Sequence, residues 1–159
     1  MEEKKVLERL MRLCVRREYC VRDIEKKAEA LLKDDTVDTG NAVGRVVAEL
    51  VKQRFVDDSR YAGAYAREKA HISGWGAVKI RQALRVKGVD DEVIADALES
   101  LDNDKVELKA QRVVETKLRQ VKDDPKCKMK LLSFAMGRGY SYDFIVPIIN
   151  RCLKNLNED

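Results

Sequence analysis

Proline and glycine are scarce in this sequence, with two prolines and eight glycines among 159 residues. That scarcity argues against a β-sandwich and against a disordered chain, because both need frequent turn formers. No stretch approaches the about 18 apolar residues that a membrane span requires. The residues that follow Met1 are charged, with no apolar segment behind them. We therefore expect neither a signal peptide nor a membrane partner.

Cysteine and histidine do not occur in a metal-binding pattern. The four cysteines form no C-x-x-C pair, and the single histidine, His71, lies far from all of them. A zinc site has little support, so we expect no metal and no cofactor. Scattered, unpaired cysteines suit a reducing cytoplasm, where they act as small buried hydrophobic residues. This interpretation applies to Cys14, Cys20, Cys127 and Cys152.

The recurrent catalytic and phosphate-binding motifs are missing as well. The sequence holds no G-x-S-x-G, no Walker loop and no G-x-G-x-x-G. His71 stands near an expected helix end, where a solvated or capping role is the usual one. Asp57 and Asp58 are adjacent carboxylates, but they stand where a helix should begin and acids cap N–H groups. We predict no catalytic residue and no enzyme activity.

The residues that are present favour helices. Charged residues make up 38% and hydrophobic residues 45% of the chain, and most of the frequent types are good helix formers. The apolar residues recur at helical spacing almost throughout, with glycine where helices should end, at Gly40, Gly74, Gly76, Gly88 and Gly139. A net charge of +4 permits an acidic partner without demanding one. The sequence predicts an all-α protein.

The sequence also repeats itself. Placing Gly88 on Gly139, an offset of 51 residues, aligns a helix, a basic residue with its glycine, a capping residue and a second helix. A longer helix is expected before each unit, at about 58–73 and 105–122, which makes two helix triplets. The aligned pairs include Lys79-Ile80 with Lys130-Leu131, Lys87 with Arg138, and Asp90 with Ser141.

A third, more divergent triplet precedes these two. Its helices are expected at 4–17, 21–33 and 42–54, with a polar loop at 34–41. We therefore predict three tandem three-helix repeats, at residues 1–56, 57–101 and 102–159. Pro147 should kink the last helix, because it lacks a backbone donor. Core positions of the second repeat should be Tyr61, Ile80, Leu84, Ile94 and Leu98.

Two windows without acidic residues are the main candidates for binding. They run from Lys69 to Val89 and from Pro125 to Tyr142, and each covers the middle helix of a triplet. A repeated basic ridge suits a repeating anionic partner, either a phosphate backbone or an acidic protein filament; the alternative is a solvated helix face. The candidate docking residues are Lys79, Arg81, Arg85, Lys87, Lys126, Lys128, Lys130 and Arg138.

Trp75 lies between two glycines, which give its ring little local cover. Tryptophan is frequent at binding hot spots, so Trp75 is a further candidate for partner or nucleic-acid contact. A packing role between helices is the favoured alternative.

Three segments resemble motifs of the RecX family. Residues 55–62, FVDDSRYA, resemble that family's (F/Y)-x-D-D-x-R-(F/Y)-A. Residues 74–89 resemble G-(F/W/Y)-G-x-x-(K/R)-I-x-x-x-L-x-x-K-G-(I/V), a long and specific pattern. Residues 17–24, REYCVRDI, look like R-E-x-S-x-x-E-L, with Cys20 in place of serine and Asp23-Ile24 in place of Glu-Leu.

The resemblance implies three tandem three-helix repeats in an elongated, curved array. It also implies a cytoplasmic regulator of the RecA recombinase, usually inhibitory, that binds the RecA–DNA filament or blocks its growth. Such proteins act in homologous recombination, DNA repair and the SOS response, some of them bind DNA, and they need no cofactor. We expect a monomer here.

Two other functions stay open. One is a helical DNA-binding module that acts independently of RecA, against which the mild net charge and the acidic third helix of the second repeat speak. The other is a scaffold of helical repeats with an unrelated protein partner.

Overall fold

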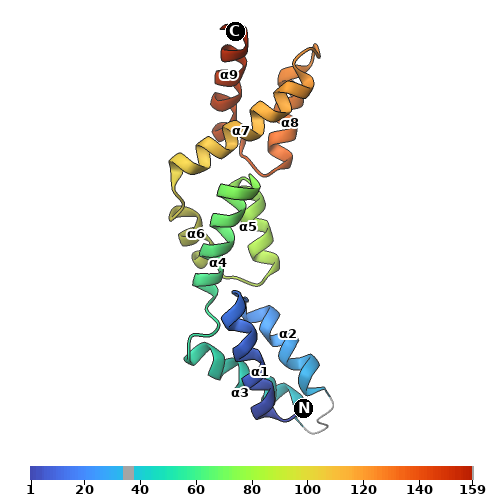
Figure 1. The fold of residues 1–159 in the computed structure, drawn as a ribbon, viewed down its shortest axis with the longest axis vertical. Helices are drawn as coiled ribbons and strands as arrows, with labels where there is room; N and C mark the ends of the chain where they lie inside the picture. Colours follow the sequence, from blue (N-terminus) through green and yellow to red (C-terminus); the bar gives the residue numbers. More distant parts are fainter. Residues whose placement is uncertain (34–37, 159) are drawn as a thin grey trace. The chain divides into compact units, whose positions relative to one another are not determined.

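The computed structural model describes residues 1–33 and 38–158, and helices are the only regular structure in these ranges. The chain forms two compact units, which are described separately. The first comprises Met1–Ala64 with Leu84–Ala95, and the second comprises Tyr65–Ala83 with Asp96–Asp159. The prediction of an all-α protein built from helix triplets is confirmed by the helix order along the chain (Figure 1). No helix in the described ranges is both long and apolar enough to cross a membrane.

The first unit is built on the triplet α1 (Glu3–Arg16), α2 (Val21–Leu32) and α3 (Thr39–Lys52). Each helix carries apolar residues three or four positions apart, so that one side of it is buried. The unit also contains the start of α4 (Asp58–Arg67), the end of α5 (Ala77–Val86) and the start of α6 (Asp91–Glu99). Its core consists of Val6, Leu10, Ile24, Ala28, Leu32, Val46, Val47, Leu50 and Val56.

The second unit is built on α7 (Asn103–Val121), α8 (Cys127–Gly137) and α9 (Tyr142–Glu158). It also holds the end of α4, a six-residue π-helix at Glu68–Ser73, the start of α5 and the end of α6. Its core consists of Ala110, Val114, Leu118, Leu131, Ala135, Tyr140, Ile145, Ile148, Ile149 and Cys152. Of the core positions expected in the second repeat, only Leu98 is half-buried, and the other four are buried.

Several helix ends differ from the sequence prediction. The helix expected at 58–73 is α-helical only to Arg67 and then continues as the wider π-helix, which ends at Gly74 with a φ of 71°. Gly40 lies in the first turn of α3, so its predicted role as a helix end is wrong. The expected polar loop at 34–41 is also wrong from residue 39 onward, and residues 34–37 lie outside the described ranges. Pro147 lies inside α9, and its kink stays a prediction.

Gly88 and Gly139 end helices as predicted, with φ values of 79° and 97°. The second of these turns touches the start of α5. The Gly76 N–H donates to the Arg138 carbonyl at 2.9 Å, and the Val78 N–H donates to the Gly139 carbonyl at 3.1 Å. A Cβ on Gly76 would overlap the Gly139 carbonyl group and the Tyr140 nitrogen. Glycine at 76 is therefore required by the close approach of two backbones.

This approach predicts a large difference between two glycine substitutions. Gly76→Ala should lower the free energy of unfolding by about 3 kcal/mol, the upper end of the overpacking range, because only backbone can yield. Gly137→Ala is the matched control: Gly137 is the last residue of α8, and its added Cβ meets nothing within 4 Å. It should be neutral or should stabilise by up to about 1 kcal/mol. Chemical denaturation measures both, and equal effects would contradict the contact.

Candidate partner-binding surface

In the first unit, the turn that follows α5 packs on the first turn of α2. The Arg22 guanidinium donates to the Val86 carbonyl at 2.8 Å, and Lys87 Nζ lies 3.0 Å from Asp23 Oδ2. A Cβ on Gly88 would lie 2.7 Å from the Arg22 guanidinium carbon, so Gly88 also allows this contact. Lys87, a predicted docking residue, is therefore engaged inside the unit.

The second unit contains a contact of the same kind, and each of these two contacts between a turn and an earlier segment is called a joint below. Here the turn after α8 packs on the residues that precede α5. Arg138 Nε donates to the Gly74 carbonyl at 2.9 Å, and its terminal nitrogen donates to the Ser73 carbonyl. The separation along the chain is 64 residues for Asp23–Lys87 and also for Gly74–Arg138. At the offset of 51 residues, Lys87 corresponds to Arg138 and Asp23 corresponds to Gly74. In the second joint, Arg138 caps the carbonyl end of the π-helix.

The Asp23–Lys87 pair carries a measurable electrostatic signature. Burial by itself would raise the pKa of the Asp23 carboxyl, but the hydrogen bond and the charge of Lys87 outweigh burial and lower it. Because the folded pKa lies below the ordinary value, this pair stabilises the fold above that ordinary range. The contribution is lost as the pH falls through the folded pKa.

The other predicted docking residues fall into two groups. Arg85 lies 2.8 Å from Asp91, and Lys130 pairs with Asp124, so these two charges are partly compensated. Within the described ranges, no carboxylate lies within ion-pair distance of the remaining four, which are Lys79, Arg81, Lys126 and Lys128.

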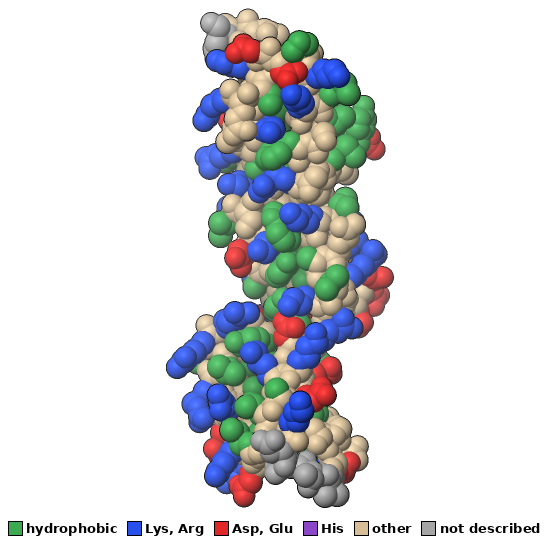
Figure 2. Space-filling view, turned by 90° about the vertical axis from the view of Figure 1, so that its right-hand side faces the viewer, with side chains coloured by type: hydrophobic (Ala, Val, Ile, Leu, Met, Phe, Trp, Pro, Cys, Tyr) green, Lys and Arg blue, Asp and Glu red, His purple; other side chains and the backbone are tan. Residues whose placement is uncertain are grey.

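Helical spacing divides the basic residues of α5. Arg81 and Arg85 are four residues apart and share a side of the helix, whereas Lys79 points away from both. Figure 2 shows a face of the molecule on which Lys and Arg side chains are interspersed with hydrophobic ones and acidic side chains are fewer.

Trp75 is the centre of an aromatic and basic cluster in the second unit. Lys79 Nζ lies 4.2 Å and Lys69 Nζ 4.6 Å from the centre of a Trp75 ring, and Tyr65 meets that tryptophan edge-on at 6.4 Å. The indole is half-buried, so it packs against its neighbours and also reaches the surface. Lys69 begins the first window without acidic residues, but its contact with Trp75 is not predicted by the sequence, because the π-helix that brings the two together has no recognisable sequence pattern.

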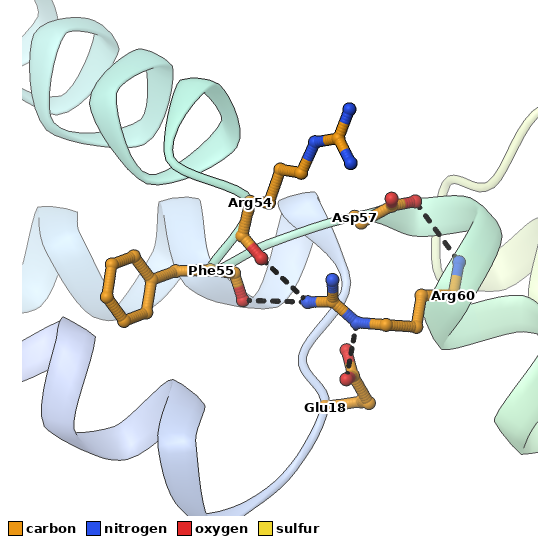
Figure 3. Close-up of polar contacts among 5 residues, drawn as sticks. All are labelled: Glu18, Arg54, Phe55, Asp57 and Arg60. Carbon is orange, nitrogen blue, oxygen red and sulfur yellow. Dashed lines mark hydrogen bonds and ion pairs between the residues drawn. The ribbon is translucent and has the colours of Figure 1, made fainter.

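Arg60 ties the loop after α3 to the linker before α2, in the first unit (Figure 3). Its Nε donates to Glu18 at 2.6 Å, and one terminal nitrogen donates to the carbonyls of Arg54 at 3.0 Å and Phe55 at 3.3 Å. The Arg54 side chain points away from this cluster in Figure 3. One guanidinium thus satisfies two carbonyls beyond a helix end and a carboxylate from another segment.

The two adjacent aspartates are caps, as the sequence predicts, but of two different helices. Asp57 accepts from the Arg60 N–H at 3.1 Å and so caps α4. Asp58 accepts from the Val21 N–H at 2.8 Å and so caps α2, which begins 37 residues earlier. Burial raises the pKa of the Asp58 carboxyl, with Asp57 and Asp90 adding to the effect and the Val21 hydrogen bond opposing it.

Comparison with known proteins identifies the family. The family model "RecX, second three-helix domain" matches residues 57–98. The regulatory protein RecX of Mycobacterium sp. (strain JLS) is 32% identical over 142 residues, which cover 82% of this chain and 78% of that protein. The chain belongs to the RecX family. The RecX protein of Clostridium acetobutylicum is 36% identical over 121 residues, but these cover only 56% of its length and 72% of this chain.

Solved RecX structures share the fold. A crystal structure of RecX from Lactobacillus salivarius superimposes with a TM-score of 0.82 at 22% identity, covering 96% of this chain and 97% of that one. A second crystal structure, of regulatory protein RecX, gives a TM-score of 0.79 at 24% identity over 94% of this chain and 71% of that one. At these identities the likeness supports the fold alone.

The RecX signature residues of this chain can now be given physical roles. Asp57, Asp58 and Arg60 cap helices and close a loop, Gly76 allows two backbones to meet, and Lys87 with Gly88 forms a joint. These residues hold the fold. Of the candidate partner-binding residues, Trp75 and Lys79 stand at specified positions of the signature, whereas Arg81, Lys126 and Lys128 stand at positions that it leaves open or does not cover.

The described residues contain no cluster of three or more His, Cys, Asp or Glu side chains that could hold a metal ion. Burial raises the pKa of the thiols of Cys14, Cys20 and Cys152, which keeps them protonated. His71 Nε2 is buried without a hydrogen-bond partner, so the predicted solvated or capping role is wrong for that nitrogen.

The geometry of Arg60 predicts that lysine cannot replace it. Arg60→Lys should lower the free energy of unfolding by about 1–2 kcal/mol, because one ammonium cannot reach Glu18 and two carbonyls together. Arg54→Lys, whose side chain points away from the cluster, is the control and should have no effect. Urea denaturation of the two variants tests the difference. A stable Arg60→Lys protein would show that the carbonyl contacts contribute nothing.

Proposed function

We propose that this chain regulates the RecA recombinase by binding the RecA–DNA filament, with inhibition as the direction of the effect. Membership of a family of regulatory proteins is the observation that carries the proposal. Filament assembly, ATP hydrolysis and strand exchange would change when the chain binds. These activities belong to RecA, and the chain itself performs no chemical step.

The four cations without a carboxylate partner are the proposed electrostatic contacts. Lys79 and Arg81 lie on α5, Lys128 lies on α8, and Lys126 directly precedes α8. Their charge is not compensated within the described ranges, so an acidic partner would gain the full interaction. Arg85 and Lys130 would exchange a surface ion pair for the partner, which yields less. Lys87 and Arg138 would act indirectly, by holding the joints on which these helices rest.

Direct contact with DNA is a second candidate function, favoured by the Trp75 cluster. An exposed part of an indole beside two ammonium groups can stack a base while the lysines meet phosphates. Such a contact could add to RecA binding, or it could act without RecA.

The regulatory proposal predicts an effect on RecA at substoichiometric amounts. The wild-type chain should lower the DNA-dependent ATPase and the strand exchange of RecA, and high salt should weaken the effect, because the contact is electrostatic. Replacing Lys79, Arg81, Lys126 and Lys128 together by alanine should abolish most of it. The control replaces four exposed basic residues of α1, Lys4, Lys5, Arg9 and Arg12, by alanine.

Because both quadruple variants lose the same charge, the control separates a local surface from net charge. If they behave alike, the proposed surface is wrong even when the wild type inhibits. If the wild type changes neither RecA activity at any ratio, the regulatory function itself is wrong.

The DNA proposal predicts a change in the fluorescence of Trp75, the only tryptophan of the chain. Single-stranded oligonucleotide should quench its emission in a saturable, salt-sensitive way. Lys69→Ala with Lys79→Ala should weaken the quenching at least about tenfold, if each lost phosphate contact is worth about 1 kcal/mol. The pair Lys4→Ala with Lys5→Ala is the control. Binding measured by anisotropy without any quenching would place DNA elsewhere on the protein.

A further inference from the structure

The outer side of α8 carries apolar side chains as well as the inner side. Leu131 and Ala135 are buried and pack into the core of the second unit. Met129, Ser133 and Met136 are spaced at i, i+4 and i+7, so they form one stripe along the helix, which we call the methionine face. Met129 is 67% exposed, Met136 is 46% exposed, and Ser133 between them is exposed too. A helix that is apolar on both sides is normally covered on both, but this face is open to solvent.

The fold does not require apolar residues at these positions. Ile24 of α2, Ile80 of α5 and Leu131 of α8 are buried at equivalent places in the middle helices of the three triplets. Two residues before, two after and five after this buried residue, the exposed side chains are Arg22, Lys26 and Glu29 in α2, Val78, Gln82 and Arg85 in α5, and Met129, Ser133 and Met136 in α8. Because α2 folds with three charged residues there, folding does not explain the two methionines of α8.

Basic residues border the methionine face, and α8 itself contains no acidic residue. Lys128 and Lys130 flank Met129 along the helix, and Lys126 directly precedes α8. Lys130 pairs with Asp124, but no carboxylate of the described residues lies within ion-pair distance of Lys126 or Lys128. An apolar stripe bordered by cations is complementary to an apolar stripe bordered by carboxylates. A second copy of this chain would instead bring like charges together, which disfavours self-association through this face.

The shape of the methionine face suits another helix. Met129 and Met136 are seven positions apart, which corresponds to about 10 Å along the helix axis. The short Ser133 side chain lies between two long ones, so one side chain of a partner helix can enter there, as in ridges-into-grooves packing. Methionine is flexible and polarizable, and it adapts to side chains of different shapes. A membrane surface would need a broader apolar face, usually with aromatic residues.

We propose that the methionine face binds an amphipathic helix of a partner protein that carries acidic residues along the edges of its apolar side. Met129 and Met136 pack on the apolar side chains of that helix, and Lys126 and Lys128 meet its carboxylates. The face shares these two lysines with the proposed regulatory contact, but the inference holds for any partner that presents such a helix.

NMR of methionine methyl groups tests the proposal, because the chain has only four methionines. The probe is the acidic amphipathic peptide acetyl-(ELEALLQ)3-amide. It should shift the methyl signals of Met129 and Met136 in a saturable way. Met1 and Met11, which lie before and on α1, are internal controls and should not move. A peptide of the same composition with a scrambled order, and acetyl-(KLKALLQ)3-amide, should each bind at least about tenfold more weakly.

Variants make the test specific, with binding measured by the anisotropy of the labelled acidic peptide. Met129→Gln with Met136→Gln keeps the length of both side chains and should weaken binding at least about tenfold, because less apolar surface is buried. Met129→Leu with Met136→Leu should retain binding. Val15→Gln with Ile72→Gln is the matched control, since these residues are 77% and 70% exposed elsewhere on the chain, and it should have no effect.

A charge reversal tests the basic border separately. Lys126→Glu with Lys128→Glu should reverse the preference, so that the variant binds acetyl-(KLKALLQ)3-amide more tightly than the acidic peptide. An unchanged preference would contradict the assigned role of the two lysines.

The proposal is overturned if millimolar acidic peptide leaves the Met129 and Met136 methyls unmoved, or if the scrambled peptide acts equally. It is also overturned if these methyls shift on dilution of the chain alone, which would indicate a second copy. An equal shift with phosphatidylglycerol vesicles would indicate a membrane surface and would overturn it too. Because neither RecA nor DNA is present, these results are independent of whether the chain regulates RecA.

Discussion

The structure depends on one kind of contact that is made twice: a basic residue and a glycine at the end of one helix pack on residues 64 positions earlier, which lie in the first turn of α2 in one case and just before α5 in the other. A triplet of about 50 residues buries too little apolar surface to be stable alone. Each joint supplies charge-assisted hydrogen bonds and a close approach at glycine, to the Arg22 side chain at Gly88 in the first joint and between two backbones at Gly76 in the second. The two joints also explain the compact units, because each attaches part of the middle triplet to a terminal one.

This constraint changes the meaning of the basic residues. Lys87 and Arg138 stand at equivalent positions in windows without acidic residues, which indicates a binding surface when the sequence is considered alone. In the fold, Lys87 forms an ion pair with Asp23, and Arg138 donates hydrogen bonds to the carbonyls of Ser73 and Gly74. Removing either would disturb a joint first, so loss of partner binding by such a variant would say little about direct contact. Only substitutions of basic residues outside the joints therefore test direct contact with the partner.

The features that are predicted from the sequence are those that depend on residues close together along the chain. The helices, the positive φ at Gly88 and Gly139, and the capping role of Asp57 all follow from neighbours within a few residues. The sequence does not predict that Asp58 caps a helix that begins 37 residues earlier, because the two are distant along the chain. It also does not predict the contact of Lys69 with Trp75, because that contact depends on an unusual local geometry, the π-helix. The predicted role of Gly40 as a helix end is wrong, because glycine occurs both near the start and after the end of helices and the local sequence does not distinguish the two.

The two joints are not identical, because different chemical groups form them. The first is closed by ionic side chains on both sides, with Arg22, Asp23 and Asp58 all satisfied inside the unit. In the second, Arg138 donates to the carbonyls of Gly74 and Ser73, and the N–H groups of Gly76 and Val78 donate to the turn after α8, so that no carboxylate takes part. A repeat array can thus keep the same kind of contact between neighbouring triplets while it exchanges ionic side chains for backbone groups.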